Sequence, residues 1–345
     1  MATDRTQVPT PIATDSVAWQ GFGEVPNYRS RWRHLTRAAW GPDYRIGVLI
    51  EELPPGGRSA PFHYHFREEE HVYILDGTLT LRLGETTHGM GPGDYVCFPA
   101  RQRAGHCLVN QSDVTARFVV IGQQDRDDVI VYPDSGKVKI RALGAAGILD
   151  LAARRGYWDG EDSGLPGIPA ETGAPLRAEP TPKLPIPAVS IEWNDEGPGK
   201  GSRFGGRSRH LTCAAVGPDY AVGVLIESPA PGRRLCPRHW HSSEEEHALI
   251  LEGEVTLLLG EERHVMRPGD YVVFPAGQPI GHSFLNSGDG RCAYLMIGGH
   301  DPDNVCVYPD SAKLSVDALR RPDVFDMTAV RDYWDGEDLG GERRP

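Results

Sequence analysis

Residues 63–110 read HYHFREEEHVYILDGTLTLRLGETTHGMGPGDYVCFPARQRAGHCLVN, and residues 239–286 read HWHSSEEEHALILEGEVTLLLGEERHVMRPGDYVVFPAGQPIGHSFLN. The two stretches align without a gap at an offset of 176 residues (239 − 63), and 28 of their 48 positions are identical. The same offset links RHLT at Arg33 and VYPDS at Val131 to second copies further along the chain. A repeat of this length indicates a whole domain rather than a short solenoid unit.

Each copy has the pattern of short strands joined by turns. VYILDGTLTLRLG and ALILEGEVTLLLG each place an Asp-Gly or Glu-Gly pair between two apolar stretches, which is typical of a β-hairpin. The chain is also rich in Gly (41) and Pro (29), the residues that tight turns need. We therefore predict an all-β fold, made of two tandem jelly-roll barrels packed as a pseudo-two-fold pair. The few short helices include one at the end of each copy, within residues 146–158 and 321–334.

Length and composition divide the chain into an N-terminal tail, two domains and the linker between them. A chain of 345 residues is long enough for about two domains. From the repeat we expect domains over residues 16–163 and 189–340. Residues 1–15 carry neither an apolar core nor a basic lead, so we expect a disordered tail and no secretory signal. The proline-rich residues 164–188 are expected to form an extended linker.

The charge and the cysteines narrow the choice of partners and compartment. A formal net charge of −12 argues against a nucleic-acid partner, because phosphate backbones attract basic surfaces. No apolar run approaches the roughly 20 residues of a membrane-spanning helix. None of the six cysteines has CxxC spacing, which favours free thiols and a cytoplasmic location. We expect a small-molecule substrate, and the sequence leaves homo-oligomerisation open.

The strongest chemical signal is a set of histidines and a glutamate that occurs in both copies. The set consists of His63, His65, Glu70 and His106 in the first copy and His239, His241, Glu246 and His282 in the second. Residues i and i+2 of a strand point to the same face, so the first two imidazoles of each set should lie side by side. The last histidine of each set must come from a strand that folds back across the barrel.

Three neutral imidazoles and one carboxylate form a mixed nitrogen and oxygen site. Such a set suits Fe(II), Mn(II), Zn(II), Ni(II) or Cu(II), whereas calcium and magnesium prefer oxygen ligands alone. Closed structural zinc sites favour cysteine-rich tetrahedra, which this set is not. Four protein ligands leave two positions of a six-coordinate ion open to substrate, water or dioxygen. We predict one divalent transition metal in each domain.

The sequence around these ligands resembles the cupin superfamily. Residues 57–77, GRSAPFHYHFREEEHVYILDG, resemble the first cupin motif, Gly-x5-His-x-His-x4-Glu-x6-Gly. Residues 92–110, PGDYVCFPARQRAGHCLVN, resemble the second motif, which ends in asparagine, although both copies carry two extra residues before the histidine. In the second copy Arg233 replaces Gly57 of the first. The resemblance covers nearly the whole chain and implies a bicupin with a metal inside each conserved barrel.

The fold by itself does not choose the reaction. We expect non-haem Fe(II) to oxidise or cleave a small oxygenated metabolite, in the manner of a dioxygenase, with the substrate chelating through an enolate, carboxylate or hydroxyl group. One alternative is redox-neutral chemistry at Mn, Zn or Ni, either decarboxylation, as in the bicupin oxalate decarboxylases, or isomerisation of a sugar or sugar phosphate. Another alternative is a non-catalytic bicupin that binds or stores a metabolite.

Other residues near the ligands are candidates for catalysis and substrate binding. Glu69 and Glu245 precede the ligand glutamates and are candidate acid–base groups, although such acidic runs also form solvated entrances. His71 has the opposite strand parity to its neighbour Glu70, so we expect it to point out of the barrel. Candidate substrate contacts are Tyr64, Ile74 and Leu108 in the first copy and Trp240, Ile250 and Phe284 in the second. The two pockets are expected to differ in substrate, or one alone to be catalytic.

Overall fold

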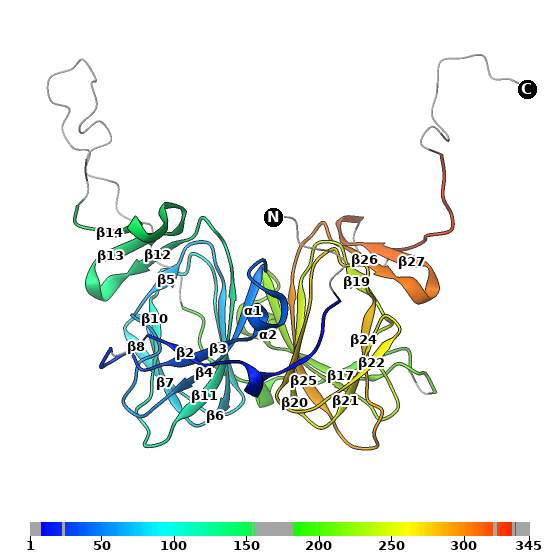
Figure 1. The fold of residues 1–345 in the computed structure, drawn as a ribbon, viewed down its shortest axis with the longest axis horizontal. Helices are drawn as coiled ribbons and strands as arrows, with labels where there is room; N and C mark the ends of the chain where they lie inside the picture. Colours follow the sequence, from blue (N-terminus) through cyan, green and yellow to red (C-terminus); the bar gives the residue numbers. More distant parts are fainter. Residues whose placement is uncertain are drawn as a thin grey trace, which may run out of the picture.

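The structure is a computed structural model that describes residues 8–22, 25–153, 155, 182–199, 201–319, 323–332 and 335. Two β-barrels stand side by side, with two short helices between them (Figure 1). These helices are α1 (Leu35–Trp40) and α2 (Leu211–Val216). The predicted all-β pair of barrels is confirmed. Among the described residues, no helix is long and apolar enough to cross a membrane.

The first barrel is built from three antiparallel sheets. Its strands are β2 (Gln20–Gly21), β3 (Arg31–His34), β4 (Ile46–Leu53), β5 (Tyr64–His65), β6 (Glu70–Asp76), β7 (Leu79–Leu83), β8 (Thr86–Met90), β9 (Asp94–Phe98), β10 (His106–Val109), β11 (Ala116–Gln123), β12 (Val129–Tyr132), β13 (Lys137–Ile140), β14 (Ile148–Asp150) and β15 (Ile186–Pro187). The large sheet runs β15-β9-β6-β11-β4-β3-β2, and the smaller ones run β10-β7-β8 and β14-β13-β12-β5.

The second barrel repeats the three sheets of the first. Its strands are β1 (Ile12–Ala13), β16 (Asn194–Glu196), β17 (Gly206–His210), β18 (Val222–Pro229), β19 (Trp240–His241), β20 (Glu246–Glu252), β21 (Val255–Leu259), β22 (Glu262–Met266), β23 (Asp270–Phe274), β24 (His282–Leu285), β25 (Ala293–Gly299), β26 (Val305–Tyr308), β27 (Lys313–Val316) and β28 (Val324–Asp326). Short 3-10 turns lie at Thr14–Ser16, Pro133–Ser135, Arg141–Ala146, Ala188–Ser190, Pro309–Ser311 and Asp317–Leu319.

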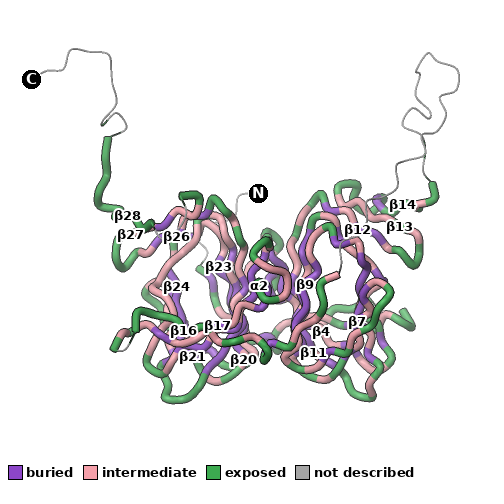
Figure 2. Tube along the Cα trace, turned by 180° about the vertical axis from the view of Figure 1, so that it is seen from behind, coloured by how far each residue is buried: buried purple, intermediate pink, exposed green. Residues whose placement is uncertain are grey.

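Alternating side chains of β6 separate two apolar cores. Val72 and Ile74 point into the first barrel and join its inner core. Tyr73, between them, joins a second core that also contains Val224 and Leu295 of the other domain. This shared core lies along the middle of the molecule, where the buried segments of α2 and β9 meet (Figure 2). Burial of both faces of β6 explains why its central residues 72–75 are all apolar instead of alternating with polar ones.

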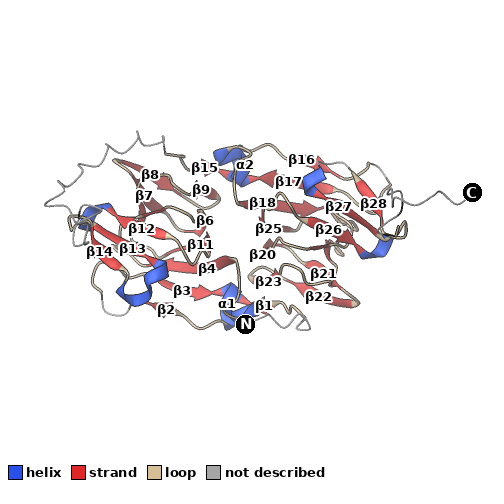
Figure 3. Cartoon of the chain, turned by 90° about the horizontal axis from the view of Figure 1, so that it is seen from above, coloured by secondary structure: helices blue, strands red, loops and turns tan. Residues whose placement is uncertain are grey.

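Each domain lends a short strand to the sheet of the other. β1, near the N-terminus, pairs with β23 of the second barrel through Ile12 and Tyr271. β15, just before the second repeat, pairs with β9 of the first barrel through Ile186 and Tyr95. Figure 3 shows these two crossings on opposite sides of the molecule, next to α1 and α2. The exchange extends the sheet edges and ties the two barrels together.

Three local predictions need correction. The predicted disordered tail 1–15 is too long, because residues 12–13 form β1, and the predicted linker 164–188 is too long, because residues 186–187 form β15. The helices predicted at the ends of the repeats are wrong within the described residues, where β14 and β28 extend the outer sheets. Residues 1–7, 154, 156–158, 164–181, 321–322 and 333–334 of these segments lie outside the described residues. The domain boundaries as such stay predictions.

Candidate metal centres

The four predicted ligands of the first domain converge on one point inside the barrel. Oε2 of Glu70 lies 2.8 Å from Nε2 of His106, and 3.5 Å from Nε2 of both His63 and His65. Two atoms that are each about 2.1 Å from one ion lie about 3.0 Å apart at a right angle and about 3.4 Å apart at the tetrahedral angle. The observed separations are therefore those of ligands around a shared ion.

The second domain has the same arrangement. Oε2 of Glu246 lies 2.9 Å from Nε2 of His282, 3.4 Å from Nε2 of His241 and 3.7 Å from Nε2 of His239. Backbone hydrogen bonds of 3.1 and 2.9 Å join His239 to His282 and hold the start of β24 against the first histidine of the set. Each half of the molecule thus contains a candidate metal site of histidine and glutamate.

The surroundings of the imidazoles in the first domain fit a metal. Nδ1 of His63 lies 2.7 Å from the carbonyl oxygen of Pro61, which only accepts a hydrogen bond, so Nδ1 carries the proton and Nε2 keeps its lone pair. The ring of His106 stacks on Phe98, with centroids 3.7 Å apart. Nε2 of His65 is buried and has no hydrogen-bond partner. A buried nitrogen of this kind costs free energy unless a ligand such as a metal ion satisfies it.

The electrostatics keep Glu70 ionised and His106 neutral, the forms in which both bind a metal. Burial raises the pKa of the Glu70 carboxyl, but the hydrogen bond from His106 and the nearby His63 and His65 outweigh it and hold that pKa well below its usual value. Burial lowers the pKa of His106 to about 4. His282 in the second domain behaves in the same way, with its pKa lowered by burial to about 4.

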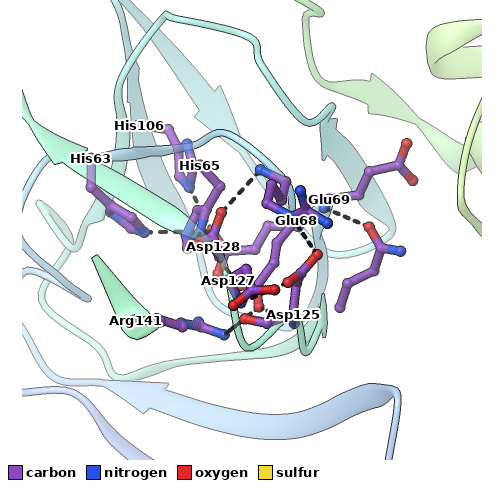
Figure 4. Close-up of polar contacts among 12 residues, drawn as sticks. His63, His65, Glu68, Glu69, His106, Asp125, Asp127, Asp128 and Arg141 are labelled. Carbon is purple, nitrogen blue, oxygen red and sulfur yellow. Dashed lines mark hydrogen bonds and ion pairs between the residues drawn. The ribbon is translucent and has the colours of Figure 1, made fainter. Parts of the chain in front are cut away.

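A carboxylate that the sequence analysis missed orients one of the ligands. Oδ2 of Asp128, a fully buried residue, lies 2.7 Å from Nδ1 of His65 (Figure 4). Burial lowers the pKa of His65, but the hydrogen bond to Asp128 and the nearby carboxylate of Glu70 outweigh it and raise that pKa to about 10. Asp128 precedes β12 and is 63 residues from its partner, so no local motif reveals it. The only signal in the sequence is that the second copy has Asn304 at this position.

A cavity of about 210 Å³ opens beside the ligands of the first domain. It is lined by Phe22, Trp32, Leu49, Glu51, Ser59, Ala60, His63, Glu70, Val72, Phe98, His106, Cys107, Leu108, Phe118 and Val120. Most of these side chains are aromatic or aliphatic. No lysine or arginine occurs among them, so the only formal charges are carboxylates.

Glu51 is the carboxyl group that reaches this cavity from outside the ligand set. Its Oε2 accepts a 2.6 Å hydrogen bond from the hydroxyl of Ser30. Burial raises the pKa of Glu51 to about 7, while the bond from Ser30 lowers it by less. The sequence analysis missed this residue as well, although the second copy keeps an acid, Glu227, at the same place, directly after the apolar residues 46–50 and 222–226 of the two strands.

The predicted substrate contacts fall into two groups. Leu108 lines the cavity, whereas Ile74 lies in the inner core of the first barrel and Tyr64 does not line the cavity. In the second barrel Ile250 and Phe284 belong to the inner core, and Trp240 lies half-buried on β19. Their role in substrate binding stays a prediction.

The predicted acid–base residues lie at the domain interface. Oε2 of Glu69 accepts hydrogen bonds of 2.9 and 3.0 Å from the backbone amides of Ala221 and Val222 in the other domain. Glu245 accepts the equivalent bond of 3.0 Å from the amide of Ile46. Neither glutamate lines the cavity of the first domain. Their catalytic role stays a prediction, and their geometry points to joining the domains.

The two pockets differ in the side chains that surround the ligands. At positions that line the first cavity, the second domain has Ser208 for Trp32, Leu235 for Ser59, Cys236 for Ala60, Ala248 for Val72, Phe284 for Leu108, Tyr294 for Phe118 and Met296 for Val120. The ring of Phe284 packs on Tyr294, with centroids 4.7 Å apart. Some exchanges enlarge a side chain and others shrink it, so the pockets differ in shape rather than simply in size.

Comparison with known proteins matches both halves of the chain to one family. The cupin domain family matches residues 49–122 and 225–298. A quercetin 2,3-dioxygenase of Bacillus subtilis is 23% identical over 301 residues, which cover 79% of this chain and 84% of that protein. The structure of oxalate decarboxylase from Bacillus subtilis is similar with a TM-score of 0.54 and 15% identity, covering 86% of this chain and 77% of that one. The structural likeness concerns the fold alone.

Proposed function

Because each half of this chain is a cupin domain, we propose that the protein is a metal-dependent enzyme of the dioxygenase type that acts on a small oxygenated metabolite. Fe(II) is the metal that this chemistry favours, with Mn(II), Zn(II), Ni(II) and Cu(II) also compatible with the ligands. The sequence relationship to a quercetin dioxygenase supports the oxidative class. The six free cysteines are in keeping with a cytoplasmic location.

The apolar lining of the first cavity is the observation that carries this proposal. Dicarboxylates and sugar phosphates are normally recognised by arginine or lysine, and the described residues around this cavity include neither. A second carboxylate, Glu51, would further repel a dianion such as oxalate. The lining instead fits a substrate with an apolar body and two neighbouring oxygens at one end.

The size of the cavity limits the substrate further. Drug-sized ligands occupy pockets of roughly 300–1,000 Å³, whereas this cavity measures about 210 Å³. We therefore expect a molecule about as large as one substituted ring, smaller than the three-ring compound quercetin. The aromatic walls formed by Phe98 and Phe118 would pack against such a ring and exclude water from it.

Several residues have defined tasks in this proposal. A redox-active metal on the four ligands would supply electron-transfer chemistry and two open positions for substrate and dioxygen. His63, Glu70 and His106 face the cavity and direct the chelating end of the substrate toward that centre. Glu51 holds or accepts a proton at a substrate oxygen, because its pKa of about 7 permits both forms near neutral pH.

The test compares oxygen uptake with anaerobic turnover. Protein loaded with Fe(II) is offered catechols, diketones, hydroxy acids and quercetin while oxygen consumption is followed. We expect uptake with single-ring catechols or diketones and none in a variant that carries both His63→Ala and His65→Ala. Anaerobic conversion of oxalate or a sugar phosphate would instead favour the decarboxylase or isomerase alternative. Tight binding without turnover, retained in that double variant, would favour a storage protein.

A further inference from the structure

The two metal sites differ in the group that lies nearest to Nδ1 of the second histidine of each set. A glutamate oxygen lies somewhat further from the same nitrogen in both domains, Oε2 of Glu68 at 3.4 Å from His65 and Oε2 of Glu244 at 3.2 Å from His241. In the first domain Oδ2 of Asp128 lies 2.7 Å from Nδ1 of His65. In the second domain Nδ2 of Asn304 lies 2.8 Å from Nδ1 of His241. Asp128 and Asn304 occupy equivalent positions in the repeat (304 − 128 = 176), and both are completely buried. The two copies therefore differ directly behind a metal ligand, where the first has a carboxylate and the second has an amide.

In the first domain the carboxylate of Asp128 holds a proton on Nδ1 of His65, the ring nitrogen that faces away from the metal site. A carboxylate only accepts hydrogen bonds, so Nδ1 of His65 carries a proton, and Nε2, which faces Glu70, is the nitrogen left to bind a metal. The other oxygen, Oδ1 of Asp128, accepts a 2.9 Å bond from the backbone amide of Arg67 and is thereby fixed. Carboxylates placed behind a ligating histidine in this way increase its basicity and orient its ring.

In the second domain the orientation of the amide works against the metal. Nδ2 of Asn304 also lies 3.0 Å from Oε2 of Glu244 and 3.3 Å from Oδ2 of Asp317. Both carboxylates only accept hydrogen bonds, so they hold the NH₂ group on this side, where it also faces Nδ1 of His241. That contact favours the proton on Nε2, the atom that faces Glu246 at 3.4 Å. To present Nε2 to a metal, Nδ1 of His241 must instead donate to a more distant acceptor, Oε2 of Glu244 at 3.2 Å, and its contact with Asn304 must change.

The charges further out differ as well. In the first domain Arg141 donates hydrogen bonds to Glu68 and to the carbonyl oxygen of Asp125 (Figure 4). The equivalent of Arg141 is Asp317, so the second domain exchanges a cation for an anion here (317 − 141 = 176). The extra negative charge attracts a cation, but it acts from beyond the amide, whereas Asp128 acts through a direct hydrogen bond to the ligand.

We propose that the exchange of Asp128 for Asn304 makes the first domain the tighter metal site, with Asp128 as the positioning residue of His65. The inference rests on the proposed metal centres and goes beyond them, because it orders the two sites. At limiting metal the first domain fills before the second. The domain with the open apolar cavity is then the one that keeps its metal when the supply is low.

The test uses full-length proteins that retain one site each. The double variant His239→Ala and His241→Ala leaves the first site, and the double variant His63→Ala and His65→Ala leaves the second. Each metal-free protein is titrated with Co(II), and the visible absorption bands give both the dissociation constant and the ligand geometry. We expect Co(II) to bind the first site about 10–100-fold more tightly than the second, the range typical for partners of this kind.

Exchange variants assign the difference to these two positions. Asp128→Asn in the first-site protein should weaken Co(II) binding about 10–100-fold and shift the absorption bands. Asp127→Asn is the matched control, because it removes the same charge from the exposed neighbouring position. Asn304→Asp, combined with Asp317→Arg to restore the arginine, should strengthen Co(II) binding in the second-site protein. This gain variant keeps the test valid if the loss variant folds poorly.

The possible outcomes separate the two proposals. Binding by neither single-site protein would overturn the metal centres and this inference together. Equal dissociation constants at the two sites would overturn the inference and leave the metal centres standing. Dissociation constants that change less than twofold in both exchange variants, with the proteins folded, would also overturn the inference. An effect of Asp127→Asn as large as that of Asp128→Asn would overturn it as well.

Discussion

The hydroxyl of Tyr95 in the first domain lies 2.7 Å from Oγ1 of Thr212 in the second. The same hydroxyl lies 2.7 Å from Nδ1 of the buried His71, so a polar chain crosses the apolar interface. The reciprocal pair, Tyr271 and Thr36, has its oxygens 2.9 Å apart. The interface therefore contains two symmetric polar bridges inside an apolar core, and each gives Nδ1 of a buried histidine, His71 or His247, a hydrogen-bond partner.

Replacing Tyr95 by phenylalanine should destabilise the protein and leave its metal content unchanged. The change leaves Nδ1 of His71 without its hydrogen-bond partner, while Oγ1 of Thr212 keeps only the bond from the amide of Val224. An unsatisfied buried group costs about 1–3 kcal/mol. Urea unfolding measures the loss. Tyr73→Phe is the control, because no hydrogen bond involves its hydroxyl within the described residues. Equal stability of the two variants would contradict a structural role for the bridge.

Replacing Glu69 by alanine should weaken the contact between the domains. The backbone amides of Ala221 and Val222 would lose their acceptor, which predicts a loss of about 2–4 kcal/mol in the free energy of unfolding. Glu69→Gln keeps one acceptor oxygen and should cost less. Turnover per folded molecule of the glutamine variant checks the acid–base role predicted from the sequence. A loss of turnover at unchanged stability would support that role over the structural one.

Removing one histidine from either set should empty that site alone. His65→Ala should lose the metal of the first domain and His241→Ala that of the second, because each removes an Nε2 that faces the ligand glutamate. Elemental analysis of the purified variants measures the metal content. His88→Ala, in β8 and outside both sets, is the control. Full occupancy in both ligand variants would refute the ligand assignment.

Enlarging one side chain in the first cavity should block the substrate and spare the metal. Leu108→Phe copies the residue of the second domain at this position and reduces a cavity of about 210 Å³. We expect a loss of roughly tenfold or more in kcat/KM for a single-ring substrate, equivalent to at least about 1.4 kcal/mol. Val109→Ile, on the opposite face of β10, should leave kcat/KM unchanged. An unaffected kcat/KM in the Leu108 variant would place the substrate elsewhere.

The buried Glu51 should make stability depend on pH. Its pKa is raised from 4.5 to about 7 in the folded protein. Below pH 4.5 the carboxyl is protonated in both states, and as pH rises toward 7 the unfolded chain releases a proton that the folded protein retains. Folding therefore loses up to about 3 kcal/mol of stability above pH 7 through this group.

Glu51→Gln removes this dependence. In the presence of a chelator, the variant should gain stability relative to the parent at pH 8 compared with pH 5. Glu85→Gln, at an exposed turn, controls for the loss of one negative charge. A difference between variant and parent that is the same at both pH values would mean that Glu51 titrates normally.

The sequence predicts the ligand cluster well because the information is local. His63 and His65 are two residues apart on one strand, so alternation alone puts them on one face. The same rule sends His71 outward, where it meets the interface. The repeat supplies the rest, since both copies keep the same spacing.

The features that the sequence analysis missed depend on contacts between distant residues. Asp128 meets His65 across 63 residues, and no spacing rule connects them. Glu51 and Glu52 are neighbours in β4, and the sequence does not tell which of the two faces the cavity until the barrel closes. The strand exchange rests on pairs of two residues at β1 and β15, which are too short to leave a periodic pattern.

The exchanged strands have a consequence for any attempt to dissect the molecule. A fragment ending after the first barrel would lack β15 and would expose the edge of β9 beside the apolar face that the other half now covers. Such an edge is a template for pairing with another chain. Its own β1 would be free to pair with β9 of a second fragment. The isolated half should therefore assemble into a reciprocal homodimer with the architecture that tandem duplication has placed in one polypeptide.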